Sequence, residues 1–194
     1  ALSIYSNNKR KLQYLSPRVA IEGHGIKRGL TAVEAAILLE QPLDKVLTMI
    51  LFGVVKKNAA QVIKRDPLDV QAIDPLPEKL HDYEKDFLTA FKESGRDRQK
   101  LLQDMMVRLV KIVSEKMKGF SRRETVDYYK AITEKAWAQV EAADTPEVKS
   151  QKFDDALEWT MLDKDYDGRT RRVFQGPMYV PMWWGHYNPT YRPA

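Results

Sequence analysis

Histidines and acidic residues are the side chains of this 194-residue chain that could hold a metal, because it has no cysteine. The histidines are His24, His81 and His186, and no two of them have the short helical spacing of a zinc motif. Without cysteine there are no disulfides, thiolate zinc sites or cysteine nucleophiles. We interpret the histidines as solvated or hydrogen-bonded side chains and expect no metal there.

A second candidate metal site is an acidic run near residue 165. Asp163, Asp165, Asp167 and Gly168 match positions 1, 3, 5 and 6 of a calcium-binding helix–loop–helix. Phe174 stands at position 12, where that loop needs a bidentate glutamate, and three arginines bring repelling charge into it. We therefore interpret the run as an acidic, turn-forming helix end without a metal.

Motifs for nucleophilic catalysis or cofactor binding are weak in this chain. There is no Gly-x-Ser-x-Gly elbow, and the spacing of Gly23, Gly25 and Gly29 does not fit the dinucleotide motif G-x-G-x-x-G. Carboxylates such as Glu34 and Glu124 have simpler roles as helix caps. We expect no catalytic residue and no cofactor, and hence a protein that is not an enzyme.

Basic residues suggest contacts to phosphate groups or to an acidic partner. The candidates are Lys45, Lys56, Lys57, Lys64 and Arg65. The net charge of +5 suits nucleic acid, an anionic membrane surface and an acidic protein about equally. Lys45 is the basic residue at the start of the helix that would read DNA, and Asp44 beside it opposes phosphates. DNA binding therefore stays an alternative, beside a merely solvated basic rim.

These basic residues belong to a pattern of two helices and two strands. Thr31 and Glu34 form a capping box that opens a helix ending near Glu40. Pro42 opens a second helix, about 43–57, and the segments 61–65 and 68–73 alternate like strands. Helix, turn, helix and hairpin is the order of a winged helix.

The rest of the chain predicts a helical unit and an irregular tail. Prolines 75 and 77 mark a boundary. Helices of about 78–94 and 97–118 follow, and two more begin at Ser121, with a second capping box, and at Thr145. From Asp163 the periodicity is lost. The tail is rich in proline, glycine and aromatic residues, and its candidate binding surface is Tyr179, Trp183, Trp184 and Tyr187.

The stretch GLTAVEAAILLEQPLDKVLTMILFGVVKKNAAQVI also carries a family resemblance. It resembles the cytosolic winged-helix-type segment of a group of uncharacterised bacterial predicted membrane proteins, over roughly residues 26–75. The shared features are the helix start Thr31–Ala35, the leucine-rich helix Val46–Val55 and a basic stop before a strand. Asn58-Ala59 stands where a glycine is usual. The resemblance implies a juxtamembrane, intracellular interaction module and supplies no functional residues.

The sequence therefore predicts a mainly α protein with a winged-helix-like unit (1–76), a helical unit of about four helices (77–162) and an aromatic, proline-rich tail (163–194). The chain begins at Ala1 without a signal-peptide pattern, so we expect a piece of a longer protein. The leading hypothesis is a protein–protein interaction region on the cytoplasmic side of a membrane-tethered bacterial protein. A DNA-binding regulator is the alternative, and a ligand pocket between the helices and the tail is the third hypothesis.

Overall fold

The computed structural model describes residues 23–176 and 184–187, and it confirms a mainly α fold with one small β-hairpin. The elements are α2 (Ala32–Leu38), α3 (Leu43–Lys56), β1 (Ala60–Arg65), β2 (Leu68–Ala72), α4 (Asp82–Ala90), α5 (Gly95–Lys116), α6 (Arg122–Glu141), α7 (Pro146–Asp155), α8 (Leu157–Thr160), α9 (Tyr166–Val173) and α10 (Trp184–Tyr187). No helix in the part of the chain that the structure describes is long and apolar enough to cross a membrane.

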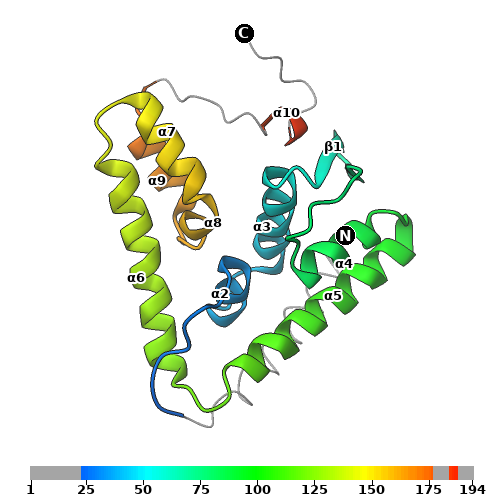
Figure 1. The fold of residues 1–194 in the computed structure, drawn as a ribbon, viewed down its shortest axis with the longest axis horizontal. Helices are drawn as coiled ribbons and strands as arrows, with labels where there is room; N and C mark the ends of the chain where they lie inside the picture. The colour runs from blue at the N-terminus through cyan, green and yellow to red at the C-terminus, as the bar shows by residue number, and fades with distance from the viewer. Residues whose placement is uncertain (1–22, 177–183, 188–194) are drawn as a thin grey trace.

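The two longest helices, α5 and α6, form the arms of a V (Figure 1). Helix α2 lies between the arms and packs on both, while α3 continues from it and contacts α4 and α8. Helix α4 runs along α5, and α7 and α8 cover α6. The antiparallel hairpin of β1 and β2 follows α3, and α10 packs on α3 and β1.

One cluster of buried apolar residues extends through α2 to α8. Its largest members include Met49 and Ile50 of α3, Phe87 of α4, Met105 of α5 and Trp137 of α6. The core thus contains residues from both sides of the boundary predicted near residue 77. Whether 1–76 and 77–162 are separate folding units stays a prediction.

The capping box predicted at the start of α2 is confirmed. Oγ1 of Thr31 accepts from the Glu34 amide at 3.1 Å, and Oε1 of Glu34 accepts from the Thr31 amide at 3.0 Å. Oε2 of Glu34 also accepts from Lys116 of α5. Because Glu34 is 2 % exposed, this ion pair supplies the charge partner that a buried carboxylate requires. The box therefore also fixes α2 against α5.

Of the two hydrogen bonds of the second predicted capping box, at the start of α6, one forms and the other does not. Ser121 caps as predicted, since its Oγ accepts from the Glu124 amide at 3.2 Å. The carboxylate of Glu124 instead accepts from the amide of Gly25 at 3.1 Å, while the Ser121 amide donates to the Gly25 carbonyl. The Glu124 carboxylate and the Ser121 amide, which would bond to each other in a capping box, thus bond to Gly25 in the segment before α2. Gly23 allows this close approach, because a Cβ there would lie 2.1 Å from the carbonyl carbon of Gly119.

The structure differs from the prediction at the C-terminal end of the helical unit. The helix predicted from Thr145 breaks at Ala156 into α7 and α8, where the backbone has φ −100° and ψ 9°. The irregular tail predicted from Asp163 contains helix α9 instead. Helix α9 has no buried residue, and Tyr166 and Val173 are its only large apolar side chains, so the sequence pattern gave little sign of it.

Candidate interaction site

Beyond residue 176, the described part of the tail is one helical turn, α10, seated on α3 and β1 (Figure 1). The ring of Tyr187 lies edge-on to the ring of Phe52 of α3, with 4.7 Å between the centroids. The guanidinium of Arg65 of β1 lies 5.1 Å from the Tyr187 ring centroid. Trp184 lies against Tyr187 at 4.8 Å. We call the surface formed by Phe52 and Arg65 the docking face.

Local sequence explains why these two side chains point outward. Leu51, Val54 and Val55 of α3 are buried in the core, whereas Phe52 lies on another side of the helix and is half-buried. Arg65 ends β1, whose last three residues are exposed. The docking face therefore sits where the outer side of α3 meets the end of the hairpin.

A cavity of about 650 Å³ adjoins the docking face, between α3 and the segment from α7 to α9. We call it the cleft. Its floor is formed by Phe153, Leu157 and Met161, which are buried. Phe52 and Trp184 are part of its walls, so the cleft and the seated α10 share residues.

Lys45, predicted as a phosphate or partner contact, lines the cleft. Its Nζ donates to the backbone carbonyl of Asp163 at 2.6 Å. Burial lowers the pKa of Lys45 below its usual value, although the carboxylates of Asp163, Asp167 and Asp44 act in the opposite direction. Lys45 thus connects the start of α3 to the loop before α9.

The other predicted basic residues are not gathered on one open surface. Nζ of Lys56 donates to a backbone carbonyl of α7. Nζ of Lys57 lies 2.6 Å from Oε1 of Glu84, whose side chain is 3 % exposed. Lys64 and Arg65 are exposed on β1, and Arg65 covers Tyr187. The structure therefore uses Lys56 and Lys57 to hold α3 against its neighbours.

The structure describes two of the four tail residues that were predicted as a binding surface. Trp184 and Tyr187 lie in α10 and contact each other. Tyr179 and Trp183 lie outside the described residues. Phe52 was not singled out in the sequence, because it lies inside the apolar run Val46–Val55. Its place off the buried stripe of α3 was the available signal.

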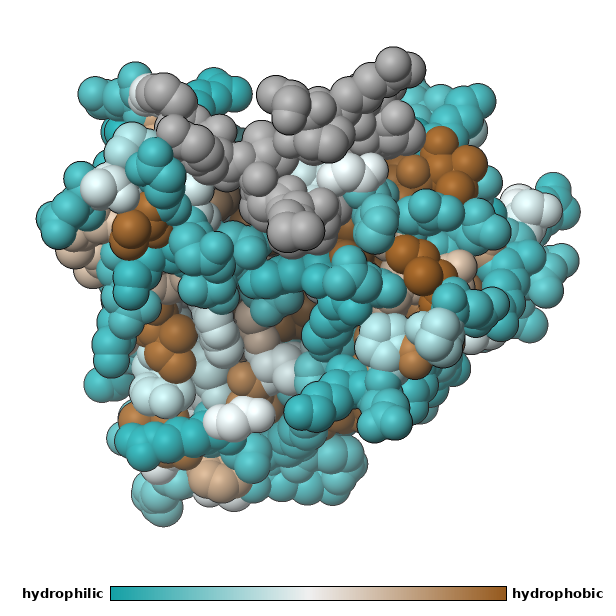
Figure 2. Space-filling model, turned by 45° about the horizontal axis from the view of Figure 1, so that its top comes forward, coloured by the Kyte–Doolittle hydropathy of each residue, from teal (hydrophilic) through white to brown (hydrophobic). Residues whose placement is uncertain are grey.

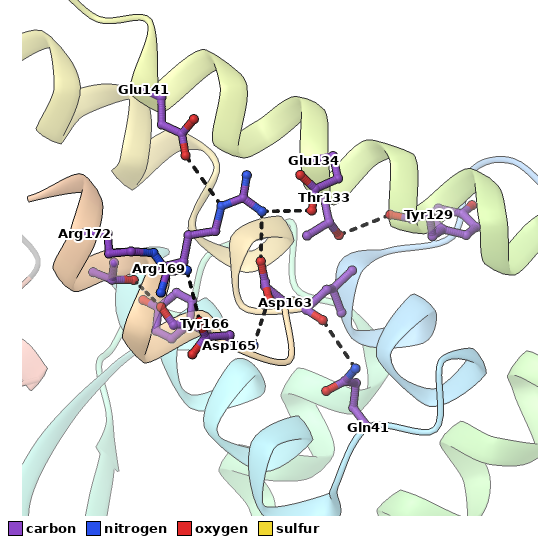
Figure 3. Close-up of polar contacts among 12 residues, drawn as sticks. Gln41, Tyr129, Thr133, Glu134, Glu141, Asp163, Asp165, Tyr166, Arg169 and Arg172 are labelled. Carbon is purple, nitrogen blue, oxygen red and sulfur yellow. Dashed lines mark hydrogen bonds and ion pairs between the residues drawn. The ribbon is translucent and has the colours of Figure 1, made fainter.

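Arg169 ties α9 to α6 (Figure 3). Its Nη1 donates to Glu134 at 2.8 Å and to Asp163 at 3.1 Å, and its Nε lies 3.5 Å from Glu141. The guanidinium also lies 5.1 Å from the ring centroid of the fully buried Trp137. The hydrogen bond to Glu134 is the main cause that raises the pKa of Arg169 above its usual value.

The acidic run tested as a calcium loop is engaged by the chain's own groups. Asp163 accepts from Arg169 and from the Asp165 amide, and the carboxylate of Asp165 pairs with Arg172 at 3.0 Å. Within residues 23–176 and 184–187, no three histidine, aspartate or glutamate side chains are grouped so that they could hold a metal ion. These arginines act as the counter-charges of the run.

Exposed apolar side chains are scattered over the surface. Among the described residues, the large ones are Ile63 in β1, Leu76 in the loop before α4, Ile112 in α5 and Val148 in α7. Figure 2 shows hydrophobic residues in separate small patches among hydrophilic ones on the face in view. Single apolar residues of this kind are normal on protein surfaces and indicate no site.

The docking face and the cleft are thus the features of the described residues that a partner could use. Helices α3 and α10 border both features. Trp184 lines the cleft, and Tyr187 lies against Phe52 of the docking face. Comparison of the chain with protein-family models, with curated proteins and with solved structures finds no match.

Proposed function

We propose that this chain is a non-enzymatic protein–protein interaction region of a larger, membrane-tethered bacterial protein, working on the cytoplasmic side. Its partner is a peptide segment that carries an aromatic residue, from another protein or from another domain of the same chain. The partner binds the docking face in place of α10.

The observation that carries this proposal is the seating of Tyr187 between Phe52 and Arg65. A four-residue helical turn has no stability of its own, so α10 is held by its contacts with α3 and β1. An edge-on aromatic pair contributes about 0.5–1.5 kcal/mol and an exposed cation–π contact about 0.5–1 kcal/mol. Contacts of this size hold a segment in place and still allow a competing segment to replace it.

The alternative, a DNA-binding regulator, has less support from the contacts. A recognition helix must present its N-terminal side chains to base edges. Helix α3 packs on α2, α4, α8, β1 and α10, and Lys45 at its start donates to the Asp163 carbonyl. Lys64 and Arg65 remain exposed and could reach phosphates. This alternative would be favoured if the chain bound duplex DNA with an affinity that falls steeply as salt is raised. Changing both Lys64 and Arg65 to Glu should then remove the binding.

The membrane-tethered part of the proposal rests on the family resemblance of residues 26–75. Its test is independent of the docking face. Reading the gene on either side of this chain should reveal runs of about 20 apolar residues, each able to span a bilayer. A complete gene without such a run would remove the tether and leave the interaction proposal standing.

The interaction proposal is tested with a labelled peptide of residues 182–190 and the full chain. In the variant Trp184→Ala/Tyr187→Ala the internal occupant is weakened, so fluorescence polarisation should report apparent binding at least about tenfold tighter than for the wild type, whose tail competes at a millimolar effective concentration. Adding Phe52→Ala to that variant should abolish the gain. Ile112→Ala, an exposed apolar change on α5, is the matched control and should leave the gain intact. Equal binding by all four chains would overturn the proposal.

A further inference from the structure

The cleft has the size and lining of a site for a small organic molecule. Its volume of about 650 Å³ falls within the roughly 300–1,000 Å³ typical of such sites. The floor residues Phe153, Leu157 and Met161 are each at most 4 % exposed. Tyr166 and Trp184 add half-buried aromatic walls. The bottom of the cleft therefore favours an apolar or aromatic group.

The charges around the cleft favour a cation. Its lining contains more carboxylates than ammonium groups: Asp44, Asp154, Asp165 and Asp167 against Lys45 and Lys164. The ammonium of Lys45 already donates to the Asp163 carbonyl, and Asp165 pairs with Arg172. Within the described part of the chain, Asp44 and Asp167 form no close ion pair, although both carboxylates interact electrostatically with Lys45. Both are exposed in the first turn of their helices.

We propose that the cleft binds a small organic cation with an apolar or aromatic body. The body lies on the floor formed by Phe153, Leu157 and Met161. The positive group lies toward the opening, where Asp44 and Asp167 attract it and the faces of the aromatic walls add cation–π contacts. An anion of the same size would meet the two carboxylates of Asp44 and Asp167 against the one ammonium of Lys45, so the cleft selects by charge.

The test is an NMR titration of the ¹⁵N-labelled full chain with three probes of similar size. Benzyltrimethylammonium is the cation, benzyl alcohol the neutral probe and benzenesulfonate the anion. The cation should give saturable shifts of the amides of Thr48, Leu157 and Thr170, which line the cleft. Its affinity should exceed that of the neutral and anionic probes by at least about tenfold, a difference of about 1.4 kcal/mol.

Variants separate charge from shape. Asp44→Asn/Asp167→Asn should weaken cation binding about tenfold and leave the neutral probe unchanged, since it removes charge with little change of volume. The exposed Asp127→Asn on α6 is the matched control and should change nothing. Thr48→Phe, at an exposed position of α3, should fill the cleft and abolish binding of all probes, with an unchanged thermal unfolding curve confirming the fold. Absence of cleft shifts, equal affinity for cation and anion, or a double variant that binds like the wild type would overturn the proposal.

Discussion

The ring of Tyr187 meets the ring of Phe52 edge-on, at 4.7 Å between centroids and 74° between planes. This pair connects the C-terminal tail to α3, and Arg65 of β1 completes the contact from the hairpin. Helix α3 is held on its other sides by α2, α4 and α8. On its remaining side, α3 binds α10, a segment from outside the helical core. This contact is the basis of the proposed function.

The hydroxyl of Tyr129 should be worth more to stability than the size of an oxygen atom suggests. It accepts from the Leu30 amide and donates to the Lys27 carbonyl, both at 2.9 Å. Tyr129→Phe leaves these backbone groups without a partner, so we expect the free energy of unfolding to fall by about 1–3 kcal/mol. Urea denaturation followed by circular dichroism measures it.

Tyr128→Phe is the matched control, since Tyr128 is the half-buried neighbour on α6. It should change the free energy of unfolding by less than about 0.5 kcal/mol. Equal effects of the two variants would show that the bonds from Tyr129 do not anchor the segment before α2.

Local signals in the sequence were enough for most helices and for the hairpin. The capping box of Thr31 and Glu34 and the start of α7 at Thr145 depend on neighbours along the chain, and both are confirmed. Helix α9 depends instead on distant partners. Arg169 is held by Glu134, far back in the chain, and no local periodicity records that bond.

The candidate site was predictable only in part, for the same physical reason. Trp184 and Tyr187 stood out as aromatic residues of an otherwise irregular tail, and Arg65 as a basic residue. Their meeting point, Phe52, belongs to a helix whose other apolar residues lie in the core or pack against it. Composition marks side chains that can bind, whereas tertiary packing decides which of them come together.

Arg169 should contribute much more to stability than its neighbour Arg172. Arg169→Ala breaks contacts with Glu134 and Asp163 and uncovers Trp137, and its own side chain is 21 % exposed. We expect a loss of about 2 kcal/mol. Arg172→Ala removes a pair with Asp165 whose side chains are 65 % and 64 % exposed, so the loss should stay below about 0.5 kcal/mol. Chemical denaturation of both variants would contradict this account if the losses were equal.

Tyr166 should make stability depend on pH in alkaline solution. Burial raises the pKa of Tyr166 from 10.0 to about 12. Between these values the unfolded chain binds fewer protons than the folded chain, so the free energy of unfolding falls as the pH rises from 10 to 12. The contribution is complete below pH 10 and lost above 12, and amounts to at most about 3 kcal/mol.

Tyr166→Phe lacks this contribution. The free energy of unfolding of the wild type minus that of the variant should therefore be constant from about pH 7 to 9 and decrease by pH 11.5. Urea denaturation at these pH values measures it. A difference that stays constant throughout would mean that the Tyr166 phenol titrates alike in the folded and unfolded chains.

The most direct test of the proposed function is the coupling between Phe52 and the tyrosine of a bound peptide. A double-mutant cycle combines Phe52→Ala, in the chain that already carries Trp184→Ala/Tyr187→Ala, with Tyr187→Ala in the peptide of residues 182–190. Binding of the four combinations is measured by fluorescence polarisation. The contact seen in the structure predicts a coupling free energy of about 0.5–1.5 kcal/mol. Additive effects, with a coupling below about 0.3 kcal/mol, would contradict the proposal that a partner binds the docking face as α10 does.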